Sequence, residues 1–245
     1  MEKLCTIDTQ DKHRIYGMHA GGFRKPLVII LHGMACTMDE VLYERGTAWF
    51  QKHGYATYRF NFYDWREGAR QLKDMTFSTH VDDFDAVVQH FKERGVKRVY
   101  VTGHSFAGPV ILASRDQAFD AASLWDPSYG LSFSKRRYNV PPGTFVQELD
   151  GYVMPWGVNP ILSSAMVREV DSLSWDTLPA HFKKPLHICV AEKGVLMKGA
   201  HAYMKKASEP KKLTIVKGAT HYFNDRAGMQ ERVYRESERW FSKYQ

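Results

Sequence analysis

Cysteine is scarce in this chain, and no apolar run is long enough to cross a membrane. The three cysteines, Cys5, Cys36 and Cys189, are odd in number, far apart and in or beside apolar segments. We therefore expect reduced packing residues and no disulfide framework. The first residues do not resemble a secretory signal, because a charged segment over residues 8–14 follows them directly. These absences predict a soluble cytoplasmic protein without a membrane span.

Motifs for cofactors and metals are missing as well. No G-x-G-x-x-G turn follows a strand, no Walker-type loop occurs, and neither H-E-x-x-H nor a Cys/His cluster is present. We expect no cofactor and no metal. The net charge of +7 is divided among short clusters such as Lys135-Arg136-Arg137 and Lys183-Lys184. This distribution argues against nucleic-acid binding, although a basic rim would attract an acidic substrate or carrier protein.

Apolar runs that alternate with amphipathic stretches predict an α/β fold. Residues 27–31 are all apolar, as in a strand covered on both faces, and residues 77–94 carry apolar side chains at helical spacing. A hairpin over residues 4–20 precedes further strands at 55–60, 96–102, 121–125, 186–190 and 213–216, and further helices at 39–53, 106–115, 199–207 and 226–244. The alternation predicts a mostly parallel sheet with helices on both faces and a site at the carboxyl ends of its strands.

One long segment breaks this alternation. From about Pro127 to Phe182 the chain is rich in proline, glycine and aromatic residues and has no clean succession of strands and helices. An irregular segment of this length inside a compact domain is usually functional. For a chain of 245 residues, we predict one core formed by residues 1–127 and 183–245 with a lid inserted over residues 128–182.

The inserted segment also supplies candidates for a substrate pocket. Its aromatic and methionine side chains favour an apolar pocket that accepts an acyl or aryl group. We select Trp156, Met154 and Tyr129 as lining residues. Most aromatic residues of the segment are expected only to attach it to the core.

The stretch Gly103-His104-Ser105-Phe106-Ala107-Gly108 follows an apolar run directly. Small residues around a serine are typical of a nucleophile elbow, where a strand turns sharply into a helix. The Ser105 hydroxyl would then stand at the carboxyl edge of the sheet, and the Phe106 amide would point to where an oxyanion forms. Ala107 departs from the usual G-x-S-x-G pattern by one methyl group. The motif predicts nucleophilic attack on a carbonyl.

A second turn provides another candidate donor. His32-Gly33-Met34 follows the first buried strand, and Gly33 would let the Met34 amide approach a substrate as the second oxyanion donor. Near the other end of the chain, His221 lies in the turn Gly218-Ala219-Thr220-His221 after the last strand. An H-G-x turn, a G-x-S-x-[GA] elbow and a late histidine turn, in this order, resemble the α/β-hydrolase family over nearly all of the chain from about Pro26.

The resemblance implies an α/β-hydrolase fold and the chemistry of a serine esterase or thioesterase. Ser105 would attack the substrate, and His221 would take the proton of its hydroxyl, which is a poor nucleophile by itself. His32 and His104 belong to the neighbouring motifs, and we expect them to be structural residues that satisfy backbone groups near the elbow.

The acid of the triad is where the chain departs from the family. Most members place an aspartate in the loop after the strand at 186–190, and this chain has Gly194 at that place. Asp126, at the end of the strand after the elbow helix, is the other position that the family uses, and we predict it as the acid. Glu192 and Asp225 remain alternatives, as does a dyad without an acid.

We therefore predict a serine hydrolase that cleaves carboxylic esters or thioesters of small to medium acyl groups through an acyl-enzyme. A catalytically silent ligand-binding protein on the same scaffold is one alternative, in which Gly194 marks a lost acid. An acyltransferase that uses the same residues is another. The expected partner is a small acyl compound, with an acidic acyl-carrier protein as a subordinate hypothesis.

Overall fold

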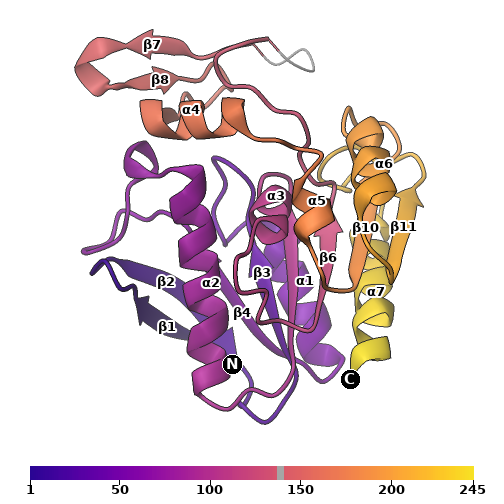
Figure 1. The fold of residues 1–245 in the computed structure, drawn as a ribbon. Helices are drawn as coiled ribbons and strands as arrows, with labels where there is room; N and C mark the ends of the chain where they lie inside the picture. The colour runs from indigo at the N-terminus through magenta and orange to yellow at the C-terminus, as the bar shows by residue number, and fades with distance from the viewer. Residues whose placement is uncertain (137–140) are drawn as a thin grey trace.

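A mixed sheet forms the centre of the protein, which the computed structural model describes over residues 1–136 and 141–245 (Figure 1). Its eight strands lie in the order β1 (Lys3–Asp8), β2 (Arg14–Ala20), β4 (Ala56–Asn61), β3 (Leu27–Leu31), β5 (Val99–His104), β6 (Ala121–Trp125), β10 (Leu186–Ala191) and β11 (Lys211–Val216). β2 pairs antiparallel with β1 and β4, and the other neighbouring strands are parallel. The predicted, mostly parallel sheet is confirmed.

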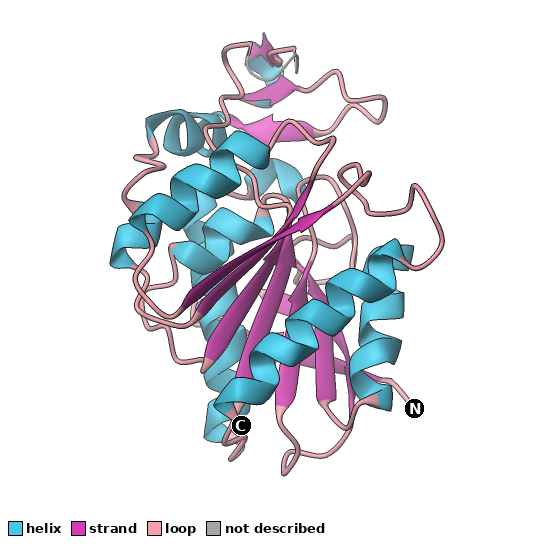
Figure 2. Cartoon of the chain, turned by 90° about the vertical axis from the view of Figure 1, so that its right-hand side faces the viewer, coloured by secondary structure: helices cyan, strands magenta, loops and turns pink. Residues whose placement is uncertain are grey.

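Helices cover both faces of the sheet (Figure 2). On one face lie α1 (Val41–Lys52) and α7 (Met229–Phe241), and on the other lie α2 (Phe77–Glu93), α3 (Ala107–Leu112) and α6 (Met197–Lys206). Successive side chains of a strand point to opposite faces, so the wholly apolar β3 contributes to two cores. Val28 and Ile30 pack with α1 and α7. Leu27, Ile29 and Leu31 point to the opposite face and pack with α2 and α3. None of the helices in the described ranges is long and apolar enough to cross a bilayer.

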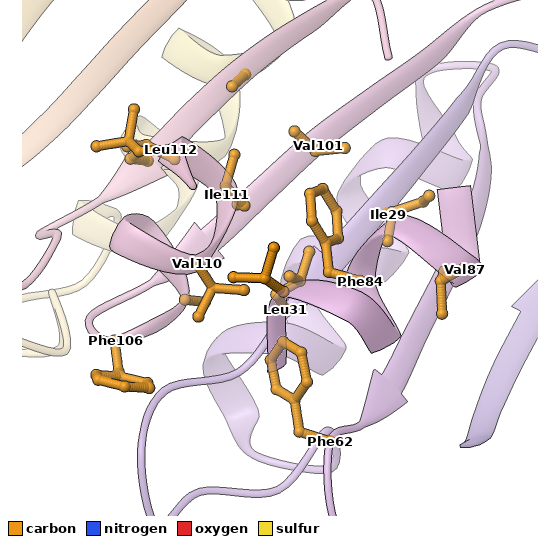
Figure 3. Close-up of a cluster of buried hydrophobic side chains, with 14 of the residues drawn as sticks. Ile29, Leu31, Phe62, Phe84, Val87, Val101, Phe106, Val110, Ile111 and Leu112 are labelled. Atoms are coloured by element: carbon orange, nitrogen blue, oxygen red, sulfur yellow. The ribbon is translucent and has the colours of Figure 1, made fainter. Parts of the chain in front are cut away.

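The core under α2 and α3 holds the elbow region in place. Figure 3 shows side chains of both helices converging on those of β3 and β5, among them Phe84, Val87, Val110, Ile111, Ile29, Leu31 and Val101. All of these side chains are inaccessible to solvent. Closely packed protein interiors resist small displacements. The position of α3 relative to β5 is therefore fixed.

Two helices of the core are shorter than the sequence pattern predicts. α3 ends at Leu112, and α7 begins at Met229, where the expected helix begins at 226. Gly228 precedes α7 with a φ of +82°, a left-handed conformation that glycine adopts without strain and that interrupts a helix. The other core elements lie within a few residues of their predicted places.

The segment between β6 and β10 has regular structure that the sequence pattern does not reveal. It contains a second, antiparallel sheet in the order β7 (Thr144–Val146), β8 (Gly151–Val153) and β9 (Ile161–Ser163), followed by α4 (Ser164–Ser172) and α5 (Leu178–His181). Three-residue strands are too short to show a period of two. In Figure 1 this sheet and α4 stack beyond one end of the main sheet.

Hydrogen bonds attach this segment to the start of α2. The Ser163 hydroxyl donates to the carbonyl oxygen of Met75 at 2.7 Å and accepts from the Met166 amide at 2.9 Å, which caps α4. The Ser78 amide donates to Glu169 Oε2 at 2.7 Å. Met166 is wholly buried in the core that also contains Phe84. The segment is therefore packed on the α/β body.

Four buried histidines, which are His32, His80, His104 and His187, make the stability of the fold depend on pH. Burial lowers the pKa of His32 to about 4 and the pKa of His80 and His187 to about 3, from the ordinary value of 6.5, and it also lowers the pKa of His104. Below pH 6.5 the unfolded chain binds protons that the folded chain excludes, so stability is present above this pH and is lost as the pH falls. Each residue contributes about 1.4 kcal/mol per pH unit in this range.

Urea denaturation at about pH 7.5 and about pH 5.5 measures this effect, and we expect the free energy of unfolding to be several kcal/mol smaller at the lower pH. His187→Gln should reduce the dependence by about one proton. His201→Gln, which changes an exposed histidine of α6, should leave it as it is. Equal stability at both pH values would mean that the folded protein accepts protons on these buried histidines.

Candidate active site

Ser105 stands at the sharp turn between β5 and α3. Its φ is +56°, a left-handed conformation that is uncommon for a residue with a side chain. A Cβ at Gly103 would lie 2.8 Å from the Ala107 Cβ and 2.8 Å from Ile111 Cδ1. β5 and α3 approach each other too closely for a side chain at this position, as expected of a nucleophile elbow.

The same contact accounts for Ala107 in place of the usual glycine. Its methyl group is fully buried and occupies the space that a side chain at Gly103 would need. On the other side of the helix, a Cβ at Gly108 would lie only 2.4 Å from the Pro127 Cβ. The small residues of the motif are therefore imposed by packing around the serine.

His221 and Asp126 meet at the carboxyl edge of the sheet. His221 follows β11, and its Nδ1 donates to Asp126 Oδ2 at 2.6 Å. The Asp126 side chain is inaccessible to solvent, whereas that of His221 is 35% exposed. Asp126 Oδ1 accepts from the Ala191 amide at 3.0 Å. Both carboxylate oxygens thus have donors, as a buried charge requires, and the imidazole is held by its Nδ1.

The two alternative acids bind the backbone of the loop that carries His221. Glu192 Oε2 accepts from the Gly218 amide at 2.7 Å, and Asp225 accepts from the Thr220 amide at 2.7 Å and its hydroxyl at 2.9 Å. Both carboxylates are exposed. The structure therefore brings Asp126, and neither alternative acid, to the ring of His221.

Gly194 lies beside the Asp126 carboxylate. A Cβ at position 194 would be 3.3 Å from Asp126 Oδ2 and 3.4 Å from the Ala191 carbonyl oxygen. The loop after β10 and the end of β6 therefore reach the same spot next to His221. In this chain the carboxylate at that spot belongs to Asp126, which directly follows β6.

The predicted oxyanion donors face the same cavity as the serine. Met34 and Phe106 line this cavity together with Ser105 and His221. Within residues 1–136 and 141–245, the amides of Met34 and Phe106 have no backbone or side-chain acceptor. A Cβ at Gly33 would lie 3.1 Å from the Ser105 Cβ, so the turn before Met34 approaches the elbow as closely as glycine allows.

His32 satisfies backbone groups, as predicted. Its Nδ1 donates to the Gly33 carbonyl oxygen at 2.7 Å, and its Nε2 accepts from the Phe62 amide at 3.1 Å. The ring is buried, and burial holds its pKa near 4. His32 is therefore a neutral residue that fixes the H-G-x turn.

An apolar cavity of about 410 Å³ opens beside Ser105. Its remaining walls are formed by Ser128, Leu131, Ser132, Phe133, Trp156, Val195 and Leu196. Trp156 lies in this wall. Val195 and Leu196 were missed, although their position after β10, a parallel strand separated from β5 only by β6, is a signal that points to them.

Two predicted pocket residues lie elsewhere. Met154 is not among the residues that line the cavity, because its side chain is wholly buried in the core that also contains Phe84, with its sulfur close to Gly143. The Tyr129 hydroxyl donates to Asp176 Oδ1 at 2.6 Å, and its ring packs against Tyr203 of α6, with ring centroids 5.1 Å apart. The structure therefore does not bring these two residues into the wall of this cavity.

Ser128 is a further hydroxyl at the elbow that the motifs did not indicate. Its Oγ lies 3.3 Å from Ser105 Oγ, and its amide donates to the Ser105 carbonyl oxygen at 3.0 Å. Within the described residues, the side-chain hydrogen bond of Ser105 is therefore formed with Ser128 and not with His221. Hydrogen bonds between catalytic groups often tighten only when a substrate binds.

The amino-acid sequence matches the model of one protein family. Residues 28–233 match the model of the Alpha/beta hydrolase family. The chain belongs to this family. Among curated proteins, no sequence matches this alpha/beta hydrolase.

Solved structures agree on the fold of this alpha/beta hydrolase. Est1E from Butyrivibrio proteoclasticus, with ferulic acid bound, is 18% identical with a TM-score of 0.79 and 98% of each chain covered. The alpha/beta hydrolase GrgF from Penicillium sp. sh18 is 17% identical with a TM-score of 0.80, covering 100% of this chain and 99% of its own. The esterase domain of a Rhodothermus marinus protein is 15% identical with a TM-score of 0.75, at 100% and 99% coverage. At these identities the likeness establishes the fold, and membership in the family supports hydrolase activity in general.

Proposed function

We propose that this protein is a serine hydrolase that cleaves carboxylic esters or thioesters of small to medium acyl groups, with Ser105, His221 and Asp126 as its catalytic triad. The observation that carries the proposal is the 2.6 Å hydrogen bond from His221 Nδ1 to the buried Asp126, formed beside a serine at an elbow on the wall of one apolar cavity. A nucleophile, a base and an orienting acid in this relation are the requirements of acyl transfer.

The proposed reaction has two halves. His221 Nε2 takes the proton of Ser105 as Oγ attacks the carbonyl carbon, and the amides of Met34 and Phe106 donate to the oxygen that becomes negative. Asp126 keeps the proton of His221 on Nδ1 and stabilises the imidazolium. The leaving alcohol or thiol receives the proton from Nε2. Water, activated in turn by His221, then releases the acid from the acyl-enzyme.

The cavity supports the proposed substrate class. A volume of about 410 Å³ with apolar side chains such as Leu131, Phe133 and Trp156 suits an acyl chain or an aryl acyl group. These three residues belong to the segment 128–182, which we propose as the lid of a core formed by residues 1–127 and 183–245. The ferulic acid bound to Est1E, a structure with the same fold, favours including an aryl acyl ester among the substrates tested. A cytoplasmic location stays a prediction from the sequence.

The test is a series of p-nitrophenyl esters from acetate to long acyl chains, with a feruloyl ester beside them and a fluorophosphonate as a label for activated serines. We expect turnover of short to medium or aryl acyl esters and stoichiometric labelling. No turnover of any ester, together with no labelling, would contradict the proposal and leave a ligand-binding protein. Product analysis with an added alcohol separates hydrolysis from acyl transfer, because the same residues serve both reactions.

An acidic acyl-carrier protein is the partner that the charges beside the cavity favour. Lys135 and Arg136 are exposed, and the Lys135 amide donates to the hydroxyl of Ser132 in the cavity wall at 3.1 Å. Arg137, the third residue of this predicted cluster, lies outside the described residues. A basic surface at the mouth would attract an acidic carrier and raise its association rate.

Reversal of these charges tests the carrier hypothesis. We expect Lys135→Glu with Arg136→Glu to lower kcat/KM for an acyl-carrier thioester by about tenfold at low salt and to leave small esters unaffected. The effect should diminish as salt increases. The matched control is Lys183→Glu with Lys184→Glu, a basic pair outside the cavity wall. Equal carrier kinetics in both double variants at every salt concentration would exclude this partner.

A further inference from the structure

His104 occupies the centre of a buried hydrogen-bond chain behind the proposed triad. It is the last residue of β5, directly before Ser105, and it is inaccessible to solvent. Its Nε2 lies 2.9 Å from the carbonyl oxygen of His221, and its Nδ1 lies 3.1 Å from the Tyr43 hydroxyl. The Tyr43 hydroxyl also accepts from the Gly33 amide at 3.1 Å. One imidazole therefore links the turns that carry the proposed base and the proposed oxyanion donor.

The partners fix the direction of each hydrogen bond. A carbonyl oxygen only accepts, so His104 Nε2 carries the hydrogen and donates to His221. Burial and then the nearby His221 hold the pKa of His104 well below the ordinary value of a histidine, so the ring is neutral and its Nδ1 is an acceptor. Tyr43 uses its single hydrogen on this nitrogen and a lone pair on the Gly33 amide. With these directions, each polar atom of the hydrogen-bond chain through His104 and Tyr43 has a partner.

We propose that His104 is a positioning residue, which holds the backbone of His221 and, through Tyr43, the Gly33 peptide in the relative positions that acyl transfer needs. The proposal rests on the proposed function and extends it to a residue that touches neither substrate nor Ser105 Oγ. Its role goes beyond satisfying backbone groups, because its two bonds tie together two loops that lie far apart in the sequence.

Two observations support a role in positioning. The rings of His104 and His221 are packed with their centroids 4.3 Å apart, so His221 is located by His104 at its carbonyl and by Asp126 at its Nδ1. Buried Gln230 also holds this loop, through a 3.1 Å hydrogen bond to the Tyr222 carbonyl oxygen, whereas Glu192 and Asp225 are exposed carboxylates, whose hydrogen bonds water and salt weaken. A displacement of about 1 Å in a catalytic group costs about 100-fold in rate, and a buried anchor guards against such a displacement.

Three substitutions separate the two bonds. His104→Gln places an amide nitrogen near Nε2 and keeps a donor for the His221 carbonyl. His104→Asn places an amide oxygen near Nδ1 and keeps an acceptor for Tyr43. His104→Met keeps the volume and loses both. We expect kcat for the best ester to fall about 100-fold in His104→Met, with KM changed less than about threefold. In His104→Gln, we expect kcat to be about tenfold higher than in His104→Met.

A spectroscopic measurement tests the inference without turnover. The proton NMR signal of His221 Nδ1–H, in its short hydrogen bond to Asp126, should be sharp in the wild type and in His104→Gln, and broadened by exchange in His104→Asn and His104→Met. His201→Met, at an exposed histidine of α6, is the matched control. If the wild type hydrolyses no ester, the proposed function fails while this signal still reports on the positioning.

Tyr43→Phe provides a test if His104→Met does not fold, since it removes only the hydroxyl. We expect it to lower kcat about tenfold with the His221 signal unchanged, because its effect reaches the oxyanion turn alone. A wild-type kcat in Tyr43→Phe, or a wild-type kcat and an unaltered His221 signal in a folded His104→Met or His104→Asn variant, would overturn the proposal.

Discussion

Ser105→Ala is expected to lower kcat/KM for an activated ester by about 10⁴-fold or more, because the alanine offers no atom to attack the carbonyl. The methyl side chain fits the elbow, since the Cβ of Ser105 is already accommodated there at a φ of +56°. The variant should therefore fold with an unchanged melting temperature. Steady-state kinetics and fluorophosphonate labelling measure the loss.

Ser128→Ala is the matched control, because its hydroxyl lies only 3.3 Å from that of Ser105. Ser128 is not at the apex of the turn, and we expect its loss to lower kcat/KM less than about tenfold. Labelling should persist in this variant and disappear in Ser105→Ala. Full labelling of Ser105→Ala would assign the nucleophile to another residue.

Asp126→Asn is expected to lower kcat by about 10⁴-fold. Asp126 Oδ1 accepts from the Ala191 amide, so the oxygen of the asparagine takes this place and its NH₂ group faces His221 Nδ1. The imidazole then carries its hydrogen on Nε2, toward Ser105, and is unable to accept the proton of the serine. KM should change little, because the cavity walls are unaltered.

Glu192→Gln makes the same chemical change at the neighbouring carboxylate. Its side-chain oxygen still accepts from the Gly218 amide, and we expect kcat within about threefold of the wild type. A large loss in Glu192→Gln with normal activity in Asp126→Asn would move the acid to the loop after β10.

Strong local constraints explain why most of the fold, and the residues that we propose as the triad, were accessible from the sequence. β3 is buried on both faces and therefore reads as a continuous apolar run, and β6 is buried in the same way but carries the polar Ser123. The elbow requires small residues at fixed spacing, and these identify Ser105 without any knowledge of packing. Asp126 is recognisable because it follows a buried strand that ends at the same edge of the sheet as the serine.

The inserted segment shows where such constraints end. The strands β7, β8 and β9 have three residues each and carry no detectable period. Aromatic composition predicts an apolar pocket, yet it does not tell which side chain faces it. Trp156 lines the cavity, whereas Met154 turns into the core, and only the packing of the segment on α2 decides between the two.

Two features of the site depend on packing between distant parts of the sequence. They are the contact between Asp126 and position 194 and the hydrogen bonds through Tyr43 and His104. The Gly194 contact joins the ends of β6 and β10, and the hydrogen bond between Tyr43 and His104 joins α1 and β5. The sequence pattern identifies Gly194 as a missing acid. The structure adds that Asp126 fills the position next to it.

Moving the carboxylate from position 126 to position 194 tests the central claim, that His221 is activated by an acid at this one spot. Glycine tolerates the φ of +44° at position 126, and its small size removes the 3.3 Å contact that a side chain at 194 would make with Asp126. We would measure kcat/KM of the wild type, Asp126→Gly, Gly194→Asp and the double variant. We expect a loss of about 10⁴-fold in Asp126→Gly and a recovery of at least about tenfold in the double variant. Wild-type activity in Asp126→Gly, or a folded double variant no better than Asp126→Gly, would contradict it.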